Sequence, residues 1–167
     1  FIGEQAGYWN TTGSDNTVLG TDAYAATGSG STGNYNVAIG RQALRANTTA
    51  NVGVAIGYQA AYNNTTGGSN VAVGSIALYS NTTGIENTAI GREALYSNTT
   101  ADDNVAVGRR ALYLNTTGTN NVGLGYQALN FNTTASYNTA VGYQAAYSNT
   151  TGTINEAIGY RALHTNS

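Results

Sequence analysis

The chain has 167 residues and a formal net charge of −2, and only 8% of its residues are charged. This composition lacks the basic surface that nucleic acid or an anionic membrane would need. It contains no cysteine, which excludes disulfides and thiolate chemistry. No apolar run approaches the length of a membrane span. We therefore expect no nucleic-acid partner and no membrane insertion in this segment.

A glycine recurs along the whole sequence, with separations of 17, then 20, then 17 seven times in a row. We call these residues the anchor glycines. They are Gly3, Gly20, Gly40, Gly57, Gly74, Gly91, Gly108, Gly125, Gly142 and Gly159. A period held with so little drift is typical of a solenoid, which stacks one structural unit per repeat.

A short strand is predicted immediately before each anchor glycine. In the segment Val71–Val73, for example, two β-branched residues flank an alanine, so they lie on one face of a strand and the alanine lies on the other. The residue directly before the glycine is aliphatic in every repeat. Stacking the repeats about 4.8 Å apart would turn this aliphatic column into a continuous core.

The residues after each anchor glycine predict a second element. An alanine always stands third, leucine is most frequent fourth, and tyrosine is most frequent fifth. The segment from Glu93 to Ser97 would then be a second strand or a short helical turn. The alanine column indicates close backbone approach, inside the coil or between neighbouring chains.

An Asn-Thr-Thr stretch follows, and its composition is typical of a turn. Its asparagines, together with a second column four residues before each glycine, would form amide ladders along the axis. The Asn-Thr-Thr stretches are also N-glycosylation sequons. The candidate glycosylation residues are Asn10, Asn47, Asn64, Asn81, Asn98, Asn115, Asn132 and Asn149. Sugar attachment and plain turn chemistry both remain open, and plain turn chemistry is favoured.

Two irregularities interrupt the pattern. Residues 27–33 contain a three-residue insertion, which predicts a loop that bulges from one face. Its letters match G-x-G-x-x-G, but neither the helix nor the acidic residue of a dinucleotide site follows. The second irregularity is Gly53, which stands where the repeat has asparagine. Neither marks a domain boundary, so residues 1–167 form a single array, which we expect to be part of a longer protein.

The position directly after the anchor glycine mixes arginine and tyrosine, two residue types that favour interfaces. This candidate interaction stripe consists of Arg41, Tyr58, Arg92, Arg109, Tyr126, Tyr143 and Tyr160. It could bind a glycan or a host-surface protein, form part of a contact between copies, or be an ordinary solvated face.

Catalytic chemistry finds little support in the sequence. The one histidine, His164, stands in the tyrosine column without placed partners. Asp102, Asp103 and Glu86 do not recur from repeat to repeat as calcium ligands of β-rolls do. We expect no enzyme activity, no catalytic residue, no metal and no cofactor.

These observations predict an all-β fold, a β-solenoid of the parallel β-roll or β-helix type with about ten coils of 17 residues. The strings Asn36–Gly40 (NVAIG) and Asn138–Ala145 (NTAVGYQA) resemble the head repeats of trimeric autotransporter adhesins. The longer 17-residue form resembles arrays in phage tail-fibre-like and bacterial surface proteins. The resemblance implies a left-handed β-roll, assembly as a homotrimer and a place outside the cell or on a cell or virion surface.

Three functions follow as hypotheses. The first is a structural and adhesive segment of an extracellular fibre. The second is a subunit of a self-assembling, N-glycosylated filament built by end-to-end stacking. The third is an ice-binding solenoid that uses the paired threonines, although adjacent threonines in a strand would point to opposite faces.

Overall fold

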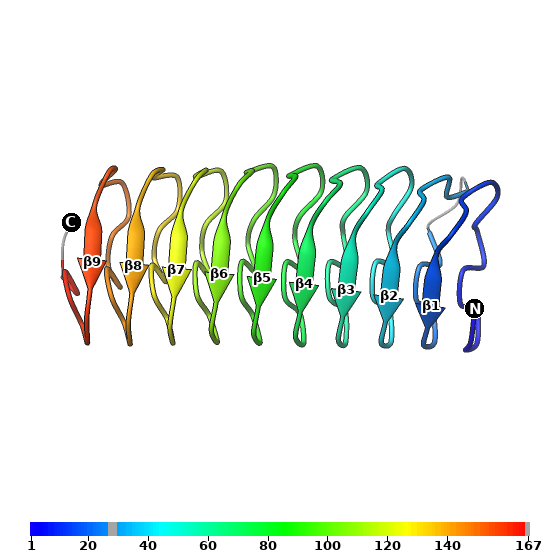
Figure 1. Cartoon of the computed structure of the whole chain (residues 1–167), viewed down its shortest axis with the longest axis horizontal. Helices are drawn as coiled ribbons and strands as arrows, with labels where there is room; N and C mark the ends of the chain where they lie inside the picture. Colours follow the sequence, from blue (N-terminus) through cyan, green and yellow to red (C-terminus); the bar gives the residue numbers. More distant parts are fainter. Residues whose placement is uncertain (27–29, 166–167) are drawn as a thin grey trace.

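The structure is a computed structural model that describes residues 1–26 and 30–165. It is a straight rod in which each repeat closes one coil (Figure 1). The described residues contain nine strands, each three residues long: β1 (Thr17–Leu19), β2 (Val37–Ile39), β3 (Val54–Ile56), β4 (Val71–Val73), β5 (Thr88–Ile90), β6 (Val105–Val107), β7 (Val122–Leu124), β8 (Thr139–Val141) and β9 (Glu156–Ile158). Within the described residues, no helix is long and apolar enough to cross a membrane.

The strands form one parallel sheet in chain order, from β1 to β9. Every strand residue pairs with its own counterpart one coil further on, as Ala55 does with Ala72. A bridge between Ile2 and Leu19 extends the same pairing toward the N-terminus. The sheet thus spans eight complete turns between β1 and β9, which confirms the predicted all-β solenoid with a 17-residue coil.

The core lies on the other side of the strands from the one we predicted. The middle residue of each strand, which is alanine in seven of the nine, is buried. Most of the alanine column and of the leucine column after the glycine is buried as well, and Leu78 and Leu95 have no exposed surface. The aliphatic residues directly before the glycine point outward instead, and Ile56 is 37% exposed. A coil of 17 residues encloses a narrow space, which alanine and leucine fill, so the β-branched pair faces outward.

The anchor glycines hold a backbone that other residues adopt only with strain. Their φ angles lie between 124° and 138°. At Gly91, an added Cβ would lie 2.7 Å from the carbonyl carbon and oxygen of Gly108. The glycine period is therefore required both by conformation and by the close stacking of successive coils.

The segment after each glycine is neither a strand nor a helix in the described coils, so this part of the prediction was wrong. It is a run of turns in which left-handed residues alternate, as at Glu93 (φ 62°) and Leu95 (φ 49°). The backbone still pairs along the rod, because Leu95 N donates to Ala111 O at 3.0 Å and Ser97 N donates to Tyr113 O at 3.1 Å. Each coil therefore carries one strand rather than two.

The predicted insertion loop, residues 27–33, lies only partly within the described residues, because residues 27–29 fall outside them. Ser31 takes the place of a threonine of the regular turn, and its hydroxyl donates to Thr48 O at 3.3 Å. The buried Tyr24 stands in the leucine column and donates its hydroxyl to Gly33 O at 2.8 Å. In the other coils the asparagine of the Asn-Thr-Thr turn donates to the carbonyl that corresponds to Gly33 O. In the coil with the insertion, the Tyr24 hydroxyl donates the bond instead.

Candidate interaction surfaces

The outward residues of the strands form an apolar stripe along one side of the rod. We call this surface the strand face; it consists of the first and third residue of each of β1 to β9. Glu156 is the one charged residue among these positions in the described strands. Ile90 and Val107 are 39% and 37% exposed. The alternation of β-branched residues around alanine predicts that the two faces of the strand differ, but it does not show that the β-branched face lies outside.

The structure brings the candidate interaction stripe into one column, directly after the strand face. Most of its side chains are exposed, with Tyr143 at 44%, while Tyr126 is half-buried. The rings of Tyr126, Tyr143 and Tyr160 stack with centroids 5.2 Å apart, and the Arg109 guanidinium lies 5.8 Å from the centroid of Tyr126. The residues of the stripe thus lie side by side on the outside of the rod, and their role in binding remains a prediction.

A second aromatic column lies on the segment after the glycines. Tyr62, Tyr79, Tyr96 and Tyr113 stack with centroids 5.2–5.3 Å apart and ring planes within 19° of parallel. Partial burial and the neighbouring tyrosines raise the pKa of Tyr79. Because each ring face meets the next ring, the column presents ring edges and hydroxyls outward.

Both predicted asparagine ladders are present. In the ladder of the Asn-Thr-Thr turns, Nδ2 of each asparagine donates to Oδ1 of the asparagine one coil earlier, at 2.7–3.2 Å from Asn81 to Asn149. In the ladder before the strands, Nδ2 of Asn121 donates to Oδ1 of Asn104 at 3.1 Å. Gly53 interrupts this second ladder, but its backbone N–H still donates to Oδ1 of Asn36 at 2.8 Å.

The candidate glycosylation residues therefore lie inside the rod, with one exception. Asn10 is half-buried, whereas the other seven have at most 1% of their surface exposed. These seven are Asn47, Asn64, Asn81, Asn98, Asn115, Asn132 and Asn149. The nitrogen that would carry the sugar, Nδ2, also donates to a backbone carbonyl within the turn, as Asn98 does to Ala101 O at 3.0 Å. Glycosylation remains a prediction, and at these seven positions it would require an open coil.

The two threonines of each turn have different surroundings. The hydroxyl of the first donates to a backbone carbonyl of the next coil at 2.9–3.3 Å, from Thr48 to Thr133. The second threonine is exposed in seven consecutive turns: Thr49, Thr66, Thr83, Thr100, Thr117, Thr134 and Thr151. We call this single file of hydroxyls and methyls the outer threonine column.

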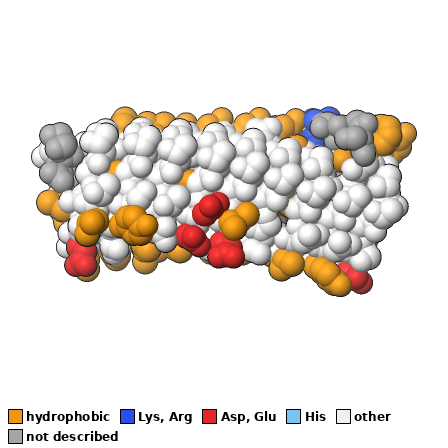
Figure 2. Space-filling view, turned by 90° about the horizontal axis from the view of Figure 1, so that it is seen from above, with side chains coloured by type: hydrophobic (Ala, Val, Ile, Leu, Met, Phe, Trp, Pro, Cys, Tyr) orange, Lys and Arg blue, Asp and Glu red, His pale blue; other side chains and the backbone are white. Residues whose placement is uncertain are grey.

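Charged groups gather near the middle of the rod. Asp102, Asp103 and Glu86 lie together at the corner before the strands, and Figure 2 shows acidic side chains grouped near mid-rod. On the other side of the strands, the buried Glu93 forms ion pairs with Arg92 (2.7 Å) and Arg110. Burial alone would raise the pKa of Glu93, but the hydrogen bond and charge of Arg110 outweigh it and lower the pKa.

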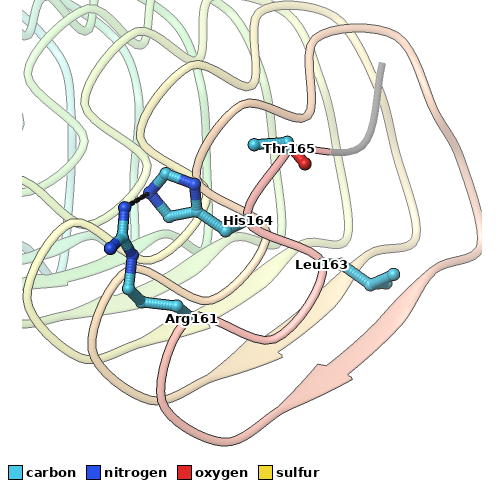
Figure 3. A pocket seen from close by; sticks show the side chains of 4 residues that line it. All are labelled: Arg161, Leu163, His164 and Thr165. Atoms are coloured by element: carbon cyan, nitrogen blue, oxygen red, sulfur yellow. Dashed lines mark hydrogen bonds between the residues drawn. The ribbon is translucent and has the colours of Figure 1, made fainter.

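The histidine and the acidic residues form no group that could hold a metal ion within the described residues. Nε2 of His164 lies 3.0 Å from a guanidinium nitrogen of Arg161, and its ring stacks on Tyr147 with centroids 5.0 Å apart. Both side chains line a shallow hollow with Leu163 and Thr165 at the last described coil (Figure 3). His164 thus continues the aromatic column in place of a tyrosine.

Comparison of the chain with protein-family models, with curated proteins and with solved structures finds no match. The fold and the surfaces therefore define the class of this protein: a β-solenoid repeat protein with β-roll-like coils. Its resemblance to the adhesin head repeats rests on the motifs in the sequence, and the parallel coils are consistent with it.

Proposed function

We propose that this chain is a non-enzymatic structural and adhesive segment of an extracellular fibre, of the surface-adhesin or tail-fibre type. In this role the rod spaces and presents binding surfaces, and copies of the chain associate along their length. The candidate interaction stripe would supply the surface that meets a host protein or glycan.

The exposed strand face is the observation that carries the proposal. Nine strands spaced about 4.8 Å apart give a stripe roughly 40 Å long and, between its two columns, about 7 Å wide. Monomeric soluble proteins rarely expose contiguous apolar patches larger than a few hundred Å², and the largest patch on a protein is often functional. The stripe has the same period as any other copy of the chain, so a second rod can cover its whole length.

Sedimentation equilibrium of the purified chain tests the self-association, with Ile90→Glu as the disruptive variant. Ile90 lies in the strand face, so a carboxylate there should dissociate the assembly while the circular dichroism spectrum is unchanged. Thr100→Glu is the matched control, because Thr100 is exposed and belongs to the outer threonine column, outside the strand face. A chain that stays monomeric at every concentration would contradict the proposal. Continuous rods longer than one chain in electron micrographs would favour the end-to-end filament.

An ice-binding role is the second candidate, and the outer threonine column is the observation that favours it. Seven exposed threonines repeat at one-coil spacing on a rigid backbone. The first threonine of each turn donates its hydroxyl to the next coil, so the array is one file wide rather than two. Thermal hysteresis of the original chain that is lost in a Thr83→Lys, Thr100→Lys double variant would support this role. If the original chain shows no thermal hysteresis at high concentration, the ice-binding role is excluded.

A further inference from the structure

We propose that copies of this chain associate side by side in parallel and in axial register. In this arrangement the acidic corner of one copy meets the basic corner of its neighbour. The inference rests on the self-association proposed above and adds the direction, the alignment and the residues of the contact. The acidic corner is Glu86, Asp102 and Asp103, and the basic corner is Arg92, Arg109 and Arg110.

The two corners border opposite sides of the strand face. Glu86 precedes β5, and Asp102 and Asp103 precede β6. Arg92 directly follows the anchor glycine after β5, and Arg109 and Arg110 follow the one after β6. Because β5 and β6 are adjacent parallel strands, both corners lie at the same level of the rod and are separated by little more than one strand.

The charges at these corners are available to a partner. Glu86, Asp103, Arg92 and Arg109 are exposed. The basic corner contains one carboxylate, Glu93, which pairs with Arg92 and Arg110. Within the described residues, no carboxylate pairs with Arg109, whose guanidinium lies over the ring of Tyr126. Three arginines and one glutamate leave this corner net positive, facing three carboxylates on the other side.

Symmetry then decides how two strand faces can meet. A rotation of 180° about an axis parallel to the rod brings the two strand faces together and exchanges their two sides. The acidic corner of one copy then lies opposite the basic corner of the other. A rotation about an axis parallel to the strands keeps each side in place and sets acid against acid and base against base. Like charges in contact oppose association, so the chain selects the parallel arrangement. A cyclic trimer, with its axis along the rod, has the same pairing.

The position of the charges also sets the axial register. The strand face is nearly uniform along its length, so its apolar contacts alone would tolerate a slip by whole coils. The opposed corners occur around β5 and β6, and a slip by one coil would leave part of each corner without its counterpart. The charges thus supply the alignment, while the aliphatic residues supply the contact area.

Resonance energy transfer between labelled copies tests the direction. The chain has no cysteine, so single cysteines at Ser14 and Thr153, both exposed and at opposite ends, accept the dyes. We expect efficient transfer between two copies labelled at Thr153→Cys and weak transfer between Ser14→Cys and Thr153→Cys copies. The reverse result would overturn the parallel arrangement and leave self-association standing. A mixture that stays monomeric would overturn both.

Charge reversal tests the residues. Glu86→Lys with Asp103→Lys, and separately Arg92→Glu with Arg109→Glu, should each weaken association roughly tenfold at low salt. The chain that carries all four changes should recover to within about threefold of the original affinity, because the opposed charges are restored. Failure of this combined variant to recover, with its circular dichroism spectrum unchanged, would overturn the pairing of the two corners.

Discussion

Nδ2 of Asn98 donates to Oδ1 of Asn81 at 2.9 Å and to the backbone oxygen of Ala101 at 3.0 Å, with both asparagines fully buried. One amide thus ties two coils together and closes a turn at the same time. The replacement Asn98→Ala would leave Oδ1 of Asn81 without its donor and would remove the Oδ1 that accepts from Nδ2 of Asn115. The Ala101 oxygen would keep the bond that Nδ2 of Asn87 donates at 2.8 Å. We expect a loss of about 1–3 kcal/mol in the free energy of unfolding, measured by urea denaturation.

Thr100→Ala is the control for that measurement. Thr100 belongs to the same turn but is exposed. Its replacement should change stability by no more than about 0.5 kcal/mol. Equal effects of the two substitutions would mean that the ladder does not stabilise the rod.

The same Gly→Ala change should be strongly destabilising at one position and nearly neutral at another. At Gly91, the backbone has a φ of 126° and the new Cβ would meet Gly108 at 2.7 Å. We expect Gly91→Ala to lower the melting temperature strongly or to prevent folding. Gly123 lies in the mid-strand column that is alanine in seven of the other strands, and its backbone is not left-handed. Gly123→Ala should therefore fold with a melting temperature close to that of the original chain.

Tyr24→Phe should reveal the role of the buried hydroxyl beside the insertion. This variant keeps the ring but removes one of the two donors to Gly33 O, because Nδ2 of Asn16 also donates there at 2.8 Å. It also removes the acceptor to which the Ser31 hydroxyl donates at 2.9 Å, so that hydroxyl keeps only its longer bond to Thr48 O. We expect a loss of about 1–3 kcal/mol in the free energy of unfolding. Tyr79→Phe removes the hydroxyl of a partly exposed ring in the aromatic column and should be close to neutral. If both variants were equally stable, Tyr24 would be acting as a hydrophobic residue alone.

Acid should weaken the middle of the rod through Glu93. Its ion pairs with Arg92 and Arg110 lower its pKa in the folded chain below the unfolded value of about 4.3. The folded state then binds its proton less readily than the unfolded state. The stabilisation is present above pH 4.3 and is lost as the pH falls through the lower folded value.

The variant Glu93→Gln isolates this effect. Glutamine fits the column, because Gln59 donates to Gln42 at 2.8 Å and Gln144 donates to Gln127 at 2.9 Å in the corresponding positions of other coils. As the pH is lowered from 6 to 2, the melting temperature of the original chain should fall more steeply than that of the variant. The same pH dependence of the melting temperature in both chains would show that Glu93 does not contribute to the acid sensitivity.

The buried sequons predict that the folded rod is a poor substrate for N-glycosylation. The seven asparagines from Asn47 to Asn149 are enclosed, and their Nδ2 atoms already donate hydrogen bonds. An N-glycosyltransferase should modify the urea-unfolded chain, after dilution, more than the folded chain. The mass spectra of both samples give the comparison. Full modification of the folded chain would mean that the turns open readily.

The repeat made the fold accessible from sequence, because each column of the pattern stacks on itself. The anchor glycines, the strand before them and both asparagine ladders follow from spacing and residue type. The side of the strand that faces the core did not follow. Ile90 and Ala89 are both apolar, and which of them lies inside depends on the width of the coil, which no single repeat reveals. The left-handed turns at Glu93 and Leu95 were also missed, since these residue types do not favour that conformation.

The surfaces were predicted less completely than the fold. The arginine and tyrosine column after the glycines is visible in the sequence as a stripe. Its relation to Glu86 and Asp103 on the other side of the strand face is not, because that relation requires the first and third residues of each strand to face outward. The substitution of Tyr24 for a ladder asparagine was hidden as well, since the two stand in different columns of the repeat.

The in-register pairing of β1 to β9 has a consequence for how such a molecule can change in size. Each strand contacts only the strands of the two adjacent coils. Removing or duplicating 17 consecutive residues therefore joins surfaces that already match, and it shortens or lengthens the rod by one step of about 4.8 Å. The 20-residue repeat between β1 and β2 keeps the strands in register only because its three extra residues lie between the strands. The length of the rod therefore changes in steps of one coil, by gain or loss of whole repeats.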